Sequence, residues 1–226
     1  MIAYISESAD KRILSALKQD GYEVIPLAPF SVLSNPVSTH TDMLILAIGD
    51  IAFVHIDYRA ELKGFKEIIR IDEQMSDKYP HDVLLNIAVV GKNVFCNTKF
   101  ASITVLEYLK SKGYFIHHVS QGYTHCSVCI VDDNAIITSD IGISRSAKNA
   151  GIDVLKISEG DISLPPYNYG FIGGTSGSHK ERIFFCGSLE CHPDGEKIRD
   201  FCRKHSKIIV ELTDTPLMDV GGILFI

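Results

Sequence analysis

Residues 108–116 have the sequence YLKSKGYFI, and the pattern in this stretch returns along the chain. An amphipathic segment followed by glycine and an apolar run predicts a helix, a left-handed glycine that ends it, and a strand. Two close copies lie at residues 16–25 (ALKQDGYEVI) and 146–155 (SAKNAGIDVL). Weaker copies lie at residues 61–69 and 202–210, the second with Ser206 in place of the glycine. A motif that recurs in this way predicts a repeat architecture.

A predicted hairpin precedes four of these endings. Gly, Asp and Asn residues, which tight turns favour, separate pairs of short apolar runs within residues 43–55, 83–96 and 127–138. A fourth pair joins residues 171–172 to residues 183–186 across a loop rich in Gly and Ser. The repeated unit is therefore strand, strand, helix, strand, and it returns every ~40–50 residues.

The fifth unit is split between the two ends of the chain. Residues 221–226 (GGILFI) predict a final strand, while residues 2–27 predict a strand, a helix near residues 9–19 and a second strand. Joining the two ends completes the missing hairpin and leaves no half-unit with an exposed edge. The sequence therefore predicts an α/β fold, a closed five-blade propeller of pseudo-symmetric units, with residues 1–226 as a single domain.

The composition is that of a globular protein. The 226 residues are 46% hydrophobic and 22% charged, with a formal net charge of −6. No apolar run approaches the ~20 residues of a membrane span, and the N-terminus lacks the basic segment of a secretory signal. We therefore expect a cytoplasmic protein with reduced cysteines, and neither nucleic acid nor membrane as its partner.

Aligning the first strands of the five units places reactive side chains at equivalent positions. One set of equivalent positions holds Asp42, Asp82, Cys126, Gly170 and Asp219, and the residues just before them are Thr41, His81, His125, Tyr169 and Met218. Equivalent positions of a closed ring converge near its centre, although only one of two adjacent strand positions points inward. Carboxylates and a thiol suit an apolar core poorly, so these residues form a candidate site, with solvated strand ends as the alternative interpretation.

The arrangement resembles the pentein fold of the guanidino-group-modifying enzymes, which include arginine deiminase, agmatine deiminase and dimethylarginine dimethylaminohydrolase. Two stretches carry the resemblance in sequence. Residues 40–42 (HTD) with the strand after them are similar to the H-x-D strand of that family. Residues 121–127 (QGYTHCS) are similar to the glycine-containing approach to its cysteine nucleophile. That family has its nucleophile in the last unit, so the order of units in this chain is circularly shifted.

The resemblance implies a cysteine-dependent hydrolase or deiminase that acts on a guanidino, amidino or related cationic small molecule in the central channel. Cys126 would attack the guanidinium carbon as a thiolate, and His40 would act as general acid and base. Asp219 or Asp42 would orient the histidine. Cys129 lies three residues from Cys126 and would point to the opposite face of the same strand, so we expect no redox pair.

The same resemblance implies the substrate-binding residues, which are Asp42, Asp82, His81 and His125. Carboxylates hold a planar guanidinium by paired, charge-assisted hydrogen bonds. The expected partner is a small cationic metabolite, no cofactor is expected, and a homodimer stays open as the oligomeric state. The unit around Gly170 offers no carboxylate at the equivalent position.

Two other functions stay open at this point. A non-catalytic pentein-fold binding protein would use an outer face, with Cys126 as a small buried apolar residue. A metal-binding hydrolase would instead use the His, Asp and Cys side chains of the channel as ligands, although none of them has a local ligand spacing.

Overall fold

The structure is a computed structural model that describes residues 1–226. It contains five three-stranded sheets, in the orders β15-β1-β2, β3-β4-β5, β6-β7-β8, β9-β10-β11 and β12-β13-β14. In each of these orders the middle strand pairs antiparallel with the strand written first and parallel with the strand written last. This shared topology confirms the predicted repetition of one unit.

The elements are short, as the repeat length requires. The strands are β1 (Ile2–Ser6), β2 (Glu23–Leu27), β3 (Leu46–Ile48), β4 (Ile51–His55), β5 (Glu67–Ile71), β6 (Ala88–Val90), β7 (Asn93–Cys96), β8 (Phe115–His118), β9 (Cys129–Asp132), β10 (Ala135–Thr138), β11 (Asp153–Lys156), β12 (Ser176–His179), β13 (Arg182–Phe185), β14 (Ile208–Glu211) and β15 (Leu224–Phe225). The α-helices are α1 (Lys11–Gln19), α2 (Thr41–Leu44), α3 (Ile103–Ser111), α4 (Ile141–Asn149) and α5 (Gly195–Lys204).

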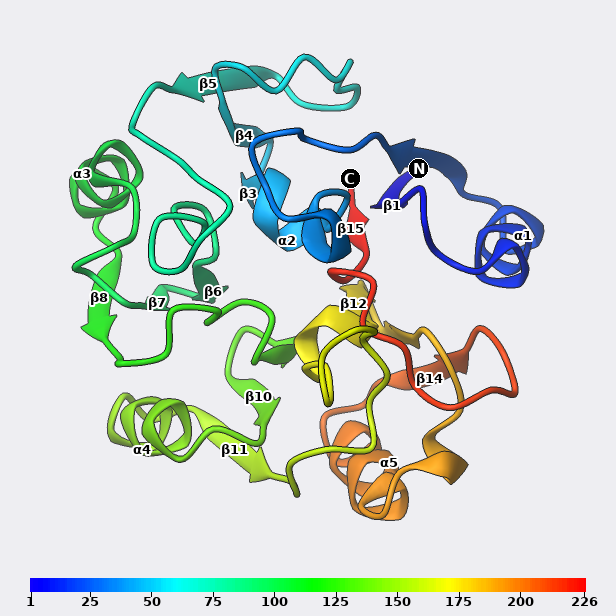
Figure 1. Ribbon diagram of the computed structural model, residues 1–226. Helices are drawn as coiled ribbons and strands as arrows, with labels where there is room; N and C mark the ends of the chain where they lie inside the picture. Colours follow the sequence, from blue (N-terminus) through cyan, green and yellow to red (C-terminus); the bar gives the residue numbers. More distant parts are fainter.

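The two ends of the chain meet in one sheet, as predicted. β15 pairs antiparallel with β1, with Ala3 opposite Phe225, and Ile2 and Ile226 exchange backbone hydrogen bonds of 2.9 and 3.0 Å. Figure 1 shows the five sheets arranged around the middle of the molecule, with α1, α3, α4 and α5 at the periphery and α2 near the centre. No helix is long and apolar enough to cross a membrane.

The helices end where the sequence pattern predicts. Gly21, Gly113 and Gly151 follow α1, α3 and α4 with φ values of +90°, +73° and +81°. Ser206 takes the same left-handed conformation after α5, with φ of +56°. Glycine adopts this conformation at no steric cost. Ser206 is the exception among these four positions, but it ends α5 in the same way.

The unit that contains β3, β4 and β5 lacks the predicted helix. Residues 56–66 form an irregular segment, although Gly64 has the expected positive φ of +82°. The hydroxyl of Tyr4 in β1 hydrogen-bonds both the backbone N–H and the carbonyl oxygen of Lys63. These are the groups that a helix would use internally, so the contact with the neighbouring sheet replaces helical hydrogen bonds at this position.

The first strands of all four predicted hairpins begin later than the apolar runs that suggested them, and β9 begins at Cys129 rather than at residue 127. Residues 41–44 form α2 rather than the start of a strand, because a short buried apolar run does not distinguish a helical turn from a strand. Residues 83–87 form turns before β6. The fourth hairpin joins β12 to β13 across Lys180 and Glu181, and residues 171–172 lie outside it. Of the reactive residues that precede these strands, Asp42 therefore lies in α2 and Asp82 in a turn.

Candidate active site

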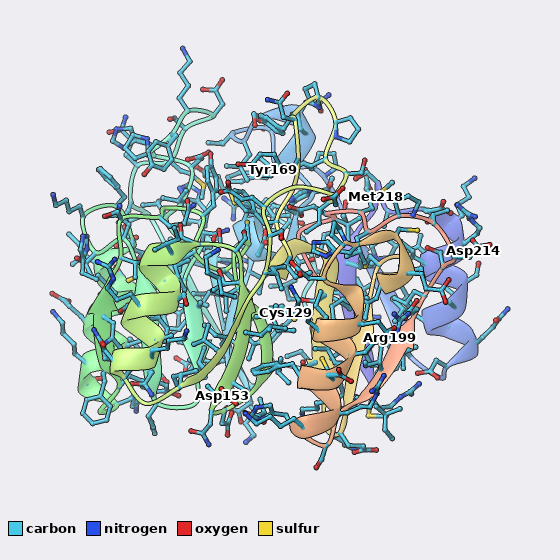
Figure 2. All side chains as sticks on the ribbon, turned by 90° about the horizontal axis from the view of Figure 1, so that it is seen from below. Cys129, Asp153, Tyr169, Arg199, Asp214 and Met218 are labelled. Atoms are coloured by element: carbon cyan, nitrogen blue, oxygen red, sulfur yellow. The ribbon has the colours of Figure 1, made fainter.

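A cavity of about 310 Å³ brings together three of the four predicted catalytic residues. We call it the aromatic pocket, and its lining residues are Val37, His40, Met43, Tyr123, Cys126, Leu164, Tyr167, Asn168, Tyr169, Phe171 and Asp219. Figure 2 shows Tyr169 toward one face of the molecule and Asp153 toward the opposite one. A mostly apolar pocket with a few convergent polar groups is the usual form of a small-molecule site.

Asp219 lies at the buried end of this pocket beside His40. Its Oδ2 accepts a hydrogen bond from the N–H of Phe171 (2.8 Å), and its Oδ1 accepts one from the N–H of Gly221 (3.0 Å). The same Oδ1 lies 3.7 Å from Nδ1 of His40, and the two side chains are 1% and 3% exposed. Burial raises the pKa of Asp219 to about 6 and lowers the pKa of His40 to about 4. Near neutral pH the pair is therefore a carboxylate beside a neutral imidazole.

Three glycines make room for this pair. A Cβ at Gly174 would lie 1.9 Å from Oδ1 of Asp219, and a Cβ at Gly170 would lie 2.5 Å from Cβ of Asp219. A Cβ at Gly221 would lie 2.3 Å from Cβ of His40. Gly170 occupies the aligned position that has no carboxylate in its own unit. Its lack of a side chain makes room for Asp219, which belongs to another unit.

Cys126 lies in the turn before β9 rather than on a strand, and Asn86 fixes it there. Oδ1 of Asn86 accepts the backbone N–H of His125 (2.7 Å) and of Cys126 (3.2 Å). Nδ2 of Asn86 donates to Sγ of Cys126 (3.0 Å) and to the carbonyl oxygen of Asp42 (3.3 Å). The sequence reasoning missed Asn86, although it is the one polar residue in the apolar run of residues 83–90.

The surroundings of Cys126 oppose ionisation of its thiol. Burial raises its pKa well above the usual value, and the carboxyl groups of Asp42 and Asp219 raise it further. The hydrogen bond from Asn86 lowers it, but by less. Because two acidic side chains oppose the thiolate, a cation in the pocket would shift this balance toward ionisation.

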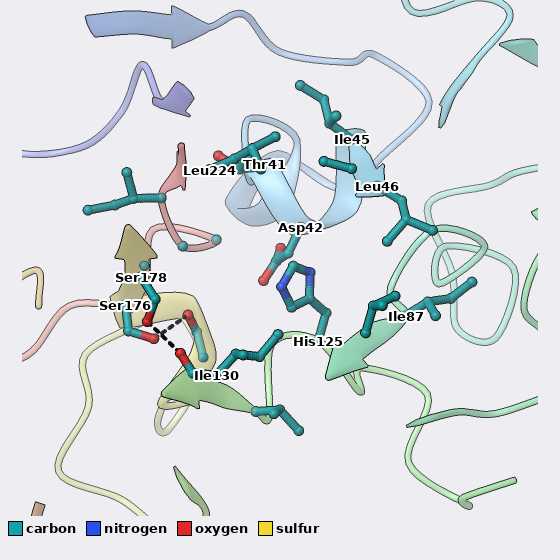
Figure 3. Close-up of a pocket in the computed structure, with 18 residues that line it drawn as sticks. Thr41, Asp42, Ile45, Leu46, Ile87, His125, Ile130, Ser176, Ser178 and Leu224 are labelled. Carbon is teal, nitrogen blue, oxygen red and sulfur yellow. Dashed lines mark hydrogen bonds between the residues drawn. The ribbon is translucent and has the colours of Figure 1, made fainter. Parts of the chain in front are cut away.

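A second cavity, of about 200 Å³, lies at the centre of the five sheets (Figure 3). We call it the central cavity. Residues of the first strand of every sheet line it, and these strands are β3, β6, β9, β12 and β15. Thr41, Asp42 and His125 also line it. Burial lowers the pKa of His125 to about 4 and raises the pKa of Asp42 well above its ordinary value, with the charge of Asp219 adding to the second shift.

The predicted substrate-binding residues do not gather in one place. Asp42 and His125 line the central cavity. Asp82 lies in neither cavity, but its Oδ2 accepts a hydrogen bond of 2.6 Å from the hydroxyl of Tyr123, which lines the aromatic pocket. His81 is exposed and lines neither cavity.

Neighbouring residues point into different cavities. His40 and Cys126 line the aromatic pocket, whereas Asp42 and His125 line the central cavity. The alignment placed Asp42 and Cys126 at equivalent positions. Asp42 lies in the helical residues 41–44 and Cys126 in the turn of residues 124–127, and the two side chains interact, since each shifts the pKa of the other. The structure contains no group of three or more His, Cys, Asp or Glu side chains that could hold a metal ion. All six cysteines are free thiols, and Cys129 packs in a different apolar cluster from Cys126.

A model of a family of unknown function, DUF6873, matches residues 4–224 of the chain. The chain belongs to that family. No curated protein matches its sequence.

Solved structures with the same fold are similar to this DUF6873 chain over most of its length. One is DDAH from Pseudomonas aeruginosa in complex with citrulline (12% identity, TM-score 0.55, covering 91% of this chain and 79% of that one). Another is SxtG, an amidinotransferase from Microseira wollei in the saxitoxin biosynthetic pathway (12% identity, TM-score 0.54, 89% and 73%). A third is agmatine deiminase from C. jejuni (10% identity, TM-score 0.54, 94% and 87%). All three have the pentein fold, so the resemblance found in the sequence is confirmed at the level of fold.

Proposed function

We propose that this DUF6873 protein is a cysteine-dependent hydrolase or deiminase that cleaves a C–N bond of a guanidino or amidino cation in the aromatic pocket. The observation that carries the proposal is the meeting of Cys126, His40 and Asp219 in one buried pocket. We further propose that the five sheets close into a five-blade propeller, which positions these side chains from three different units around one centre.

The carboxylate of Asp219 and the aromatic rings would attract a cation to this pocket. Tyr123 and Phe171 stack with ring centroids 6.2 Å apart, and Tyr169 meets Phe171 edge to face at 6.5 Å. The faces of aromatic rings bind cations favourably, and a buried carboxylate adds a direct partner for N–H donors. A bound cation would also lower the pKa of the Cys126 thiol, so the nucleophile would form only when substrate is present.

The chemistry then needs only groups that line the pocket. His40, neutral near pH 7, would accept the proton of the thiol as Sγ of Cys126 bonds to the amidino carbon. The imidazolium would return this proton to the departing amine as the C–N bond breaks. Water activated by the same imidazole would then cleave the C–S bond, which releases the ureido or amide product and restores the thiol.

The lining of the pocket also indicates a substrate class. Asp219 is its one acidic residue, and neither lysine nor arginine lines it. A substrate carboxylate would have no cationic partner there and would be repelled by Asp219. We therefore expect a guanidine or amidine without a nearby carboxylate and with an apolar or aromatic body.

The experiment is a turnover screen with guanidines and amidines that differ in charge and apolar content. Agmatine, arginine, phenylguanidine and benzamidine are suitable members, and released amine or ammonia is the readout. We expect turnover of a compound without a carboxylate and none of arginine, with loss of activity in Cys126→Ser. Turnover that survives Cys126→Ser would contradict the proposal.

The raised pKa of the Cys126 thiol favours a second candidate, a non-catalytic binding protein for the same cations. Calorimetry on the same panel separates the two candidates. Saturable binding to the aromatic pocket without any product formed would replace the hydrolase by the binding protein.

A further inference from the structure

Asp82 is a buried acid that contacts the aromatic pocket through one residue, Tyr123. It is 3% exposed, and its Oδ2 accepts a hydrogen bond of 2.6 Å from the hydroxyl of Tyr123. Its Oδ1 is buried and has no partner. Burying a carboxyl group with so few partners is costly, which indicates that it is retained for a purpose other than stability. Because Asp82 lines neither cavity, it can act on a ligand in the pocket only through Tyr123 or by its charge.

Tyr123 has a fixed position in the lining of the pocket. Its carbonyl oxygen accepts hydrogen bonds from the N–H (3.1 Å) and the hydroxyl (2.7 Å) of Ser127. Its ring stacks on Phe171 with centroids 6.2 Å apart and packs against Tyr79 at 5.7 Å. With the backbone and the ring held in this way, the remaining freedom of Tyr123 is the direction of its hydroxyl proton, and Asp82 sets that direction.

The bond to Asp82 uses the only proton that the hydroxyl of Tyr123 can donate. Burial raises the pKa of this phenol, and the hydrogen bond to Asp82 raises it further, so the proton stays on the phenol. A hydroxyl has one donor and two acceptor lone pairs, so its oxygen is left as an acceptor alone. The charges of Cys126 and Tyr167, which both line the pocket, also raise this pKa, so the oxygen lies within electrostatic reach of the thiol.

We propose that Asp82 is a positioning residue, which makes the hydroxyl oxygen of Tyr123 an acceptor for the N–H groups of the substrate. This inference rests on the proposed function and adds to it a means of telling substrate from product. A guanidine or amidine presents N–H donors, whereas the product of C–N cleavage has a carbonyl oxygen in place of one nitrogen. An oxygen that can only accept binds the first and opposes the second. Asp82 and Tyr123 together therefore favour binding of the substrate and release of the product.

The test is a double-substitution cycle on ligand binding in the Cys126→Ser protein. Phenylguanidine and phenylurea have nearly the same shape and differ in the nitrogen that the urea replaces by a carbonyl oxygen. Calorimetric titration gives the ratio of their dissociation constants in this background alone and with Asp82→Asn, Tyr123→Phe or both. We expect either substitution to lower the preference for phenylguanidine about tenfold, which is the loss of one hydrogen bond to a charged ligand. With both substitutions we expect no further loss, because Asp82 acts through the hydroxyl.

The matched control is Asp194→Asn, the same change at another buried acid. Asp194 is 4% exposed and lines neither cavity, so the ratio should stay unchanged in this variant even if its stability falls. Melting temperatures show whether each variant is folded. If Asp82→Asn does not fold, Tyr123→Phe alone still tests whether the hydroxyl oxygen discriminates between the two compounds.

Three results would overturn the proposal. The first is an unchanged ratio in Tyr123→Phe, and the second is binding of neither compound. The third is a loss from Asp82→Asn that persists in full in the Tyr123→Phe background, since Asp82 would then act by its charge alone. The Cys126→Ser protein has no nucleophile, so these results are independent of turnover, whereas turnover by the unsubstituted protein tests the proposed hydrolase.

Discussion

Asp219 in the aromatic pocket and Asp42 in the central cavity are both almost fully buried, but their surroundings differ. Each oxygen of Asp219 accepts a backbone N–H, and the pKa of this carboxyl rises only to about 6. Neither oxygen of Asp42 accepts a backbone N–H of another residue. Its side chain interacts with the thiol of Cys126, and its pKa is raised well above the ordinary value. The two backbone donors therefore favour the ionised form of Asp219, whereas burial and the charge of Asp219 oppose ionisation of Asp42.

This difference distinguishes the two cavities. The aromatic pocket offers a fixed negative charge beside a thiol and a neutral imidazole, which suits chemistry on a cationic substrate. The central cavity is lined by Asp42 and His125, and the carboxyl of Asp42 also interacts with the thiol of Cys126. Substitutions that affect one cavity and spare the other test the division.

The largest expected effect is that of Cys126→Ser. Loss of the nucleophile should lower kcat by at least about 10³-fold on any substrate found, as for other covalent catalysts. Cys129→Ser is the matched control, because Cys129 lies three residues away in a different apolar cluster and lines neither cavity. Steady-state kinetics on both variants is the measurement. An equal loss of kcat in Cys126→Ser and Cys129→Ser would mean that the substitution at Cys126 acts by disturbing the fold rather than by removing a nucleophile.

Gly174→Ala should displace Asp219 without changing any reactive group. The new Cβ would lie 1.9 Å from Oδ1 of Asp219, so the carboxylate has to move. A shift of about 1 Å in a positioning group costs on the order of 10² in rate, and we expect a loss of that size with a smaller loss of stability.

Gly142→Ala is the control for that change. Gly142 lies in α4 and lines neither cavity. The nearest atom to its added Cβ would be Oδ1 of Asp140, at 3.2 Å. The substitution should leave kcat unchanged and change stability by no more than about 1 kcal/mol, since the gain of helix propensity is offset by the close approach to Asp140. Full activity in Gly174→Ala would show that the position of Asp219 does not matter.

Asn86→Asp should affect both the thiol and the fold, because residue 86 is buried. The substituted oxygen still accepts the N–H groups of His125 and Cys126, but the donor to Sγ is lost and a negative charge is added beside it. Both changes raise the pKa of the Cys126 thiol further, so its alkylation at pH 8 should slow by about tenfold for each unit of pKa. Asn86→Ala leaves the two N–H groups unpaired and should instead lower the free energy of unfolding by about 1–3 kcal/mol. Alkylation rates and denaturant unfolding of the two variants separate these effects.

Asp42→Asn should change the pH dependence of stability. An acid whose pKa is raised by folding binds more protons in the folded state, so it loses stability as pH rises above its unfolded pKa near 3.9. The stability of Asp42→Asn relative to the unsubstituted protein should therefore increase from about pH 4 upward. The contribution of Asp219 follows the same sign but ends near pH 6, so a difference that still grows above pH 6 belongs to Asp42. The measurement is chemical denaturation of both proteins across this pH range. A difference in free energy of unfolding that does not change with pH would contradict the raised pKa of Asp42.

Much of the fold follows from the sequence because its signals are local. The glycines after α1, α3 and α4 and the turn residues of three hairpins fix the units independently of their neighbours. The half-units at the two ends then require the pairing of β15 with β1. The missing helix before β5 depends instead on a distant contact, the hydroxyl of Tyr4 on the backbone of Lys63, which no local pattern reveals.

The site was predictable in its residues but not in its geometry. The alignment of units indicated Cys126 and Asp219, the resemblance to the H-x-D strand indicated His40, and these three residues line one pocket. The separation of Asp42 and His125 into a second cavity arises from α2 and the turn at residues 124–127, where apolar runs suggested strands. Asn86 is visible in the sequence only as a polar residue within an apolar run, which does not disclose that it binds Cys126.

The most direct test of the central claim is the covalent labelling of Cys126 by a haloacetamidine, followed by intact-mass spectrometry and peptide mapping. The neutral haloacetamide of the same shape is the matched control, and Cys191→Ser removes the exposed thiol from the background. We expect a single adduct on Cys126, formed faster by the amidine than by the amide, because the cation is attracted by Asp219 and lowers the pKa of the thiol. Labelling of Cys126 by the amide as fast as by the amidine, or an amidine adduct on any other cysteine in its place, would contradict a cation-activated nucleophile in this pocket.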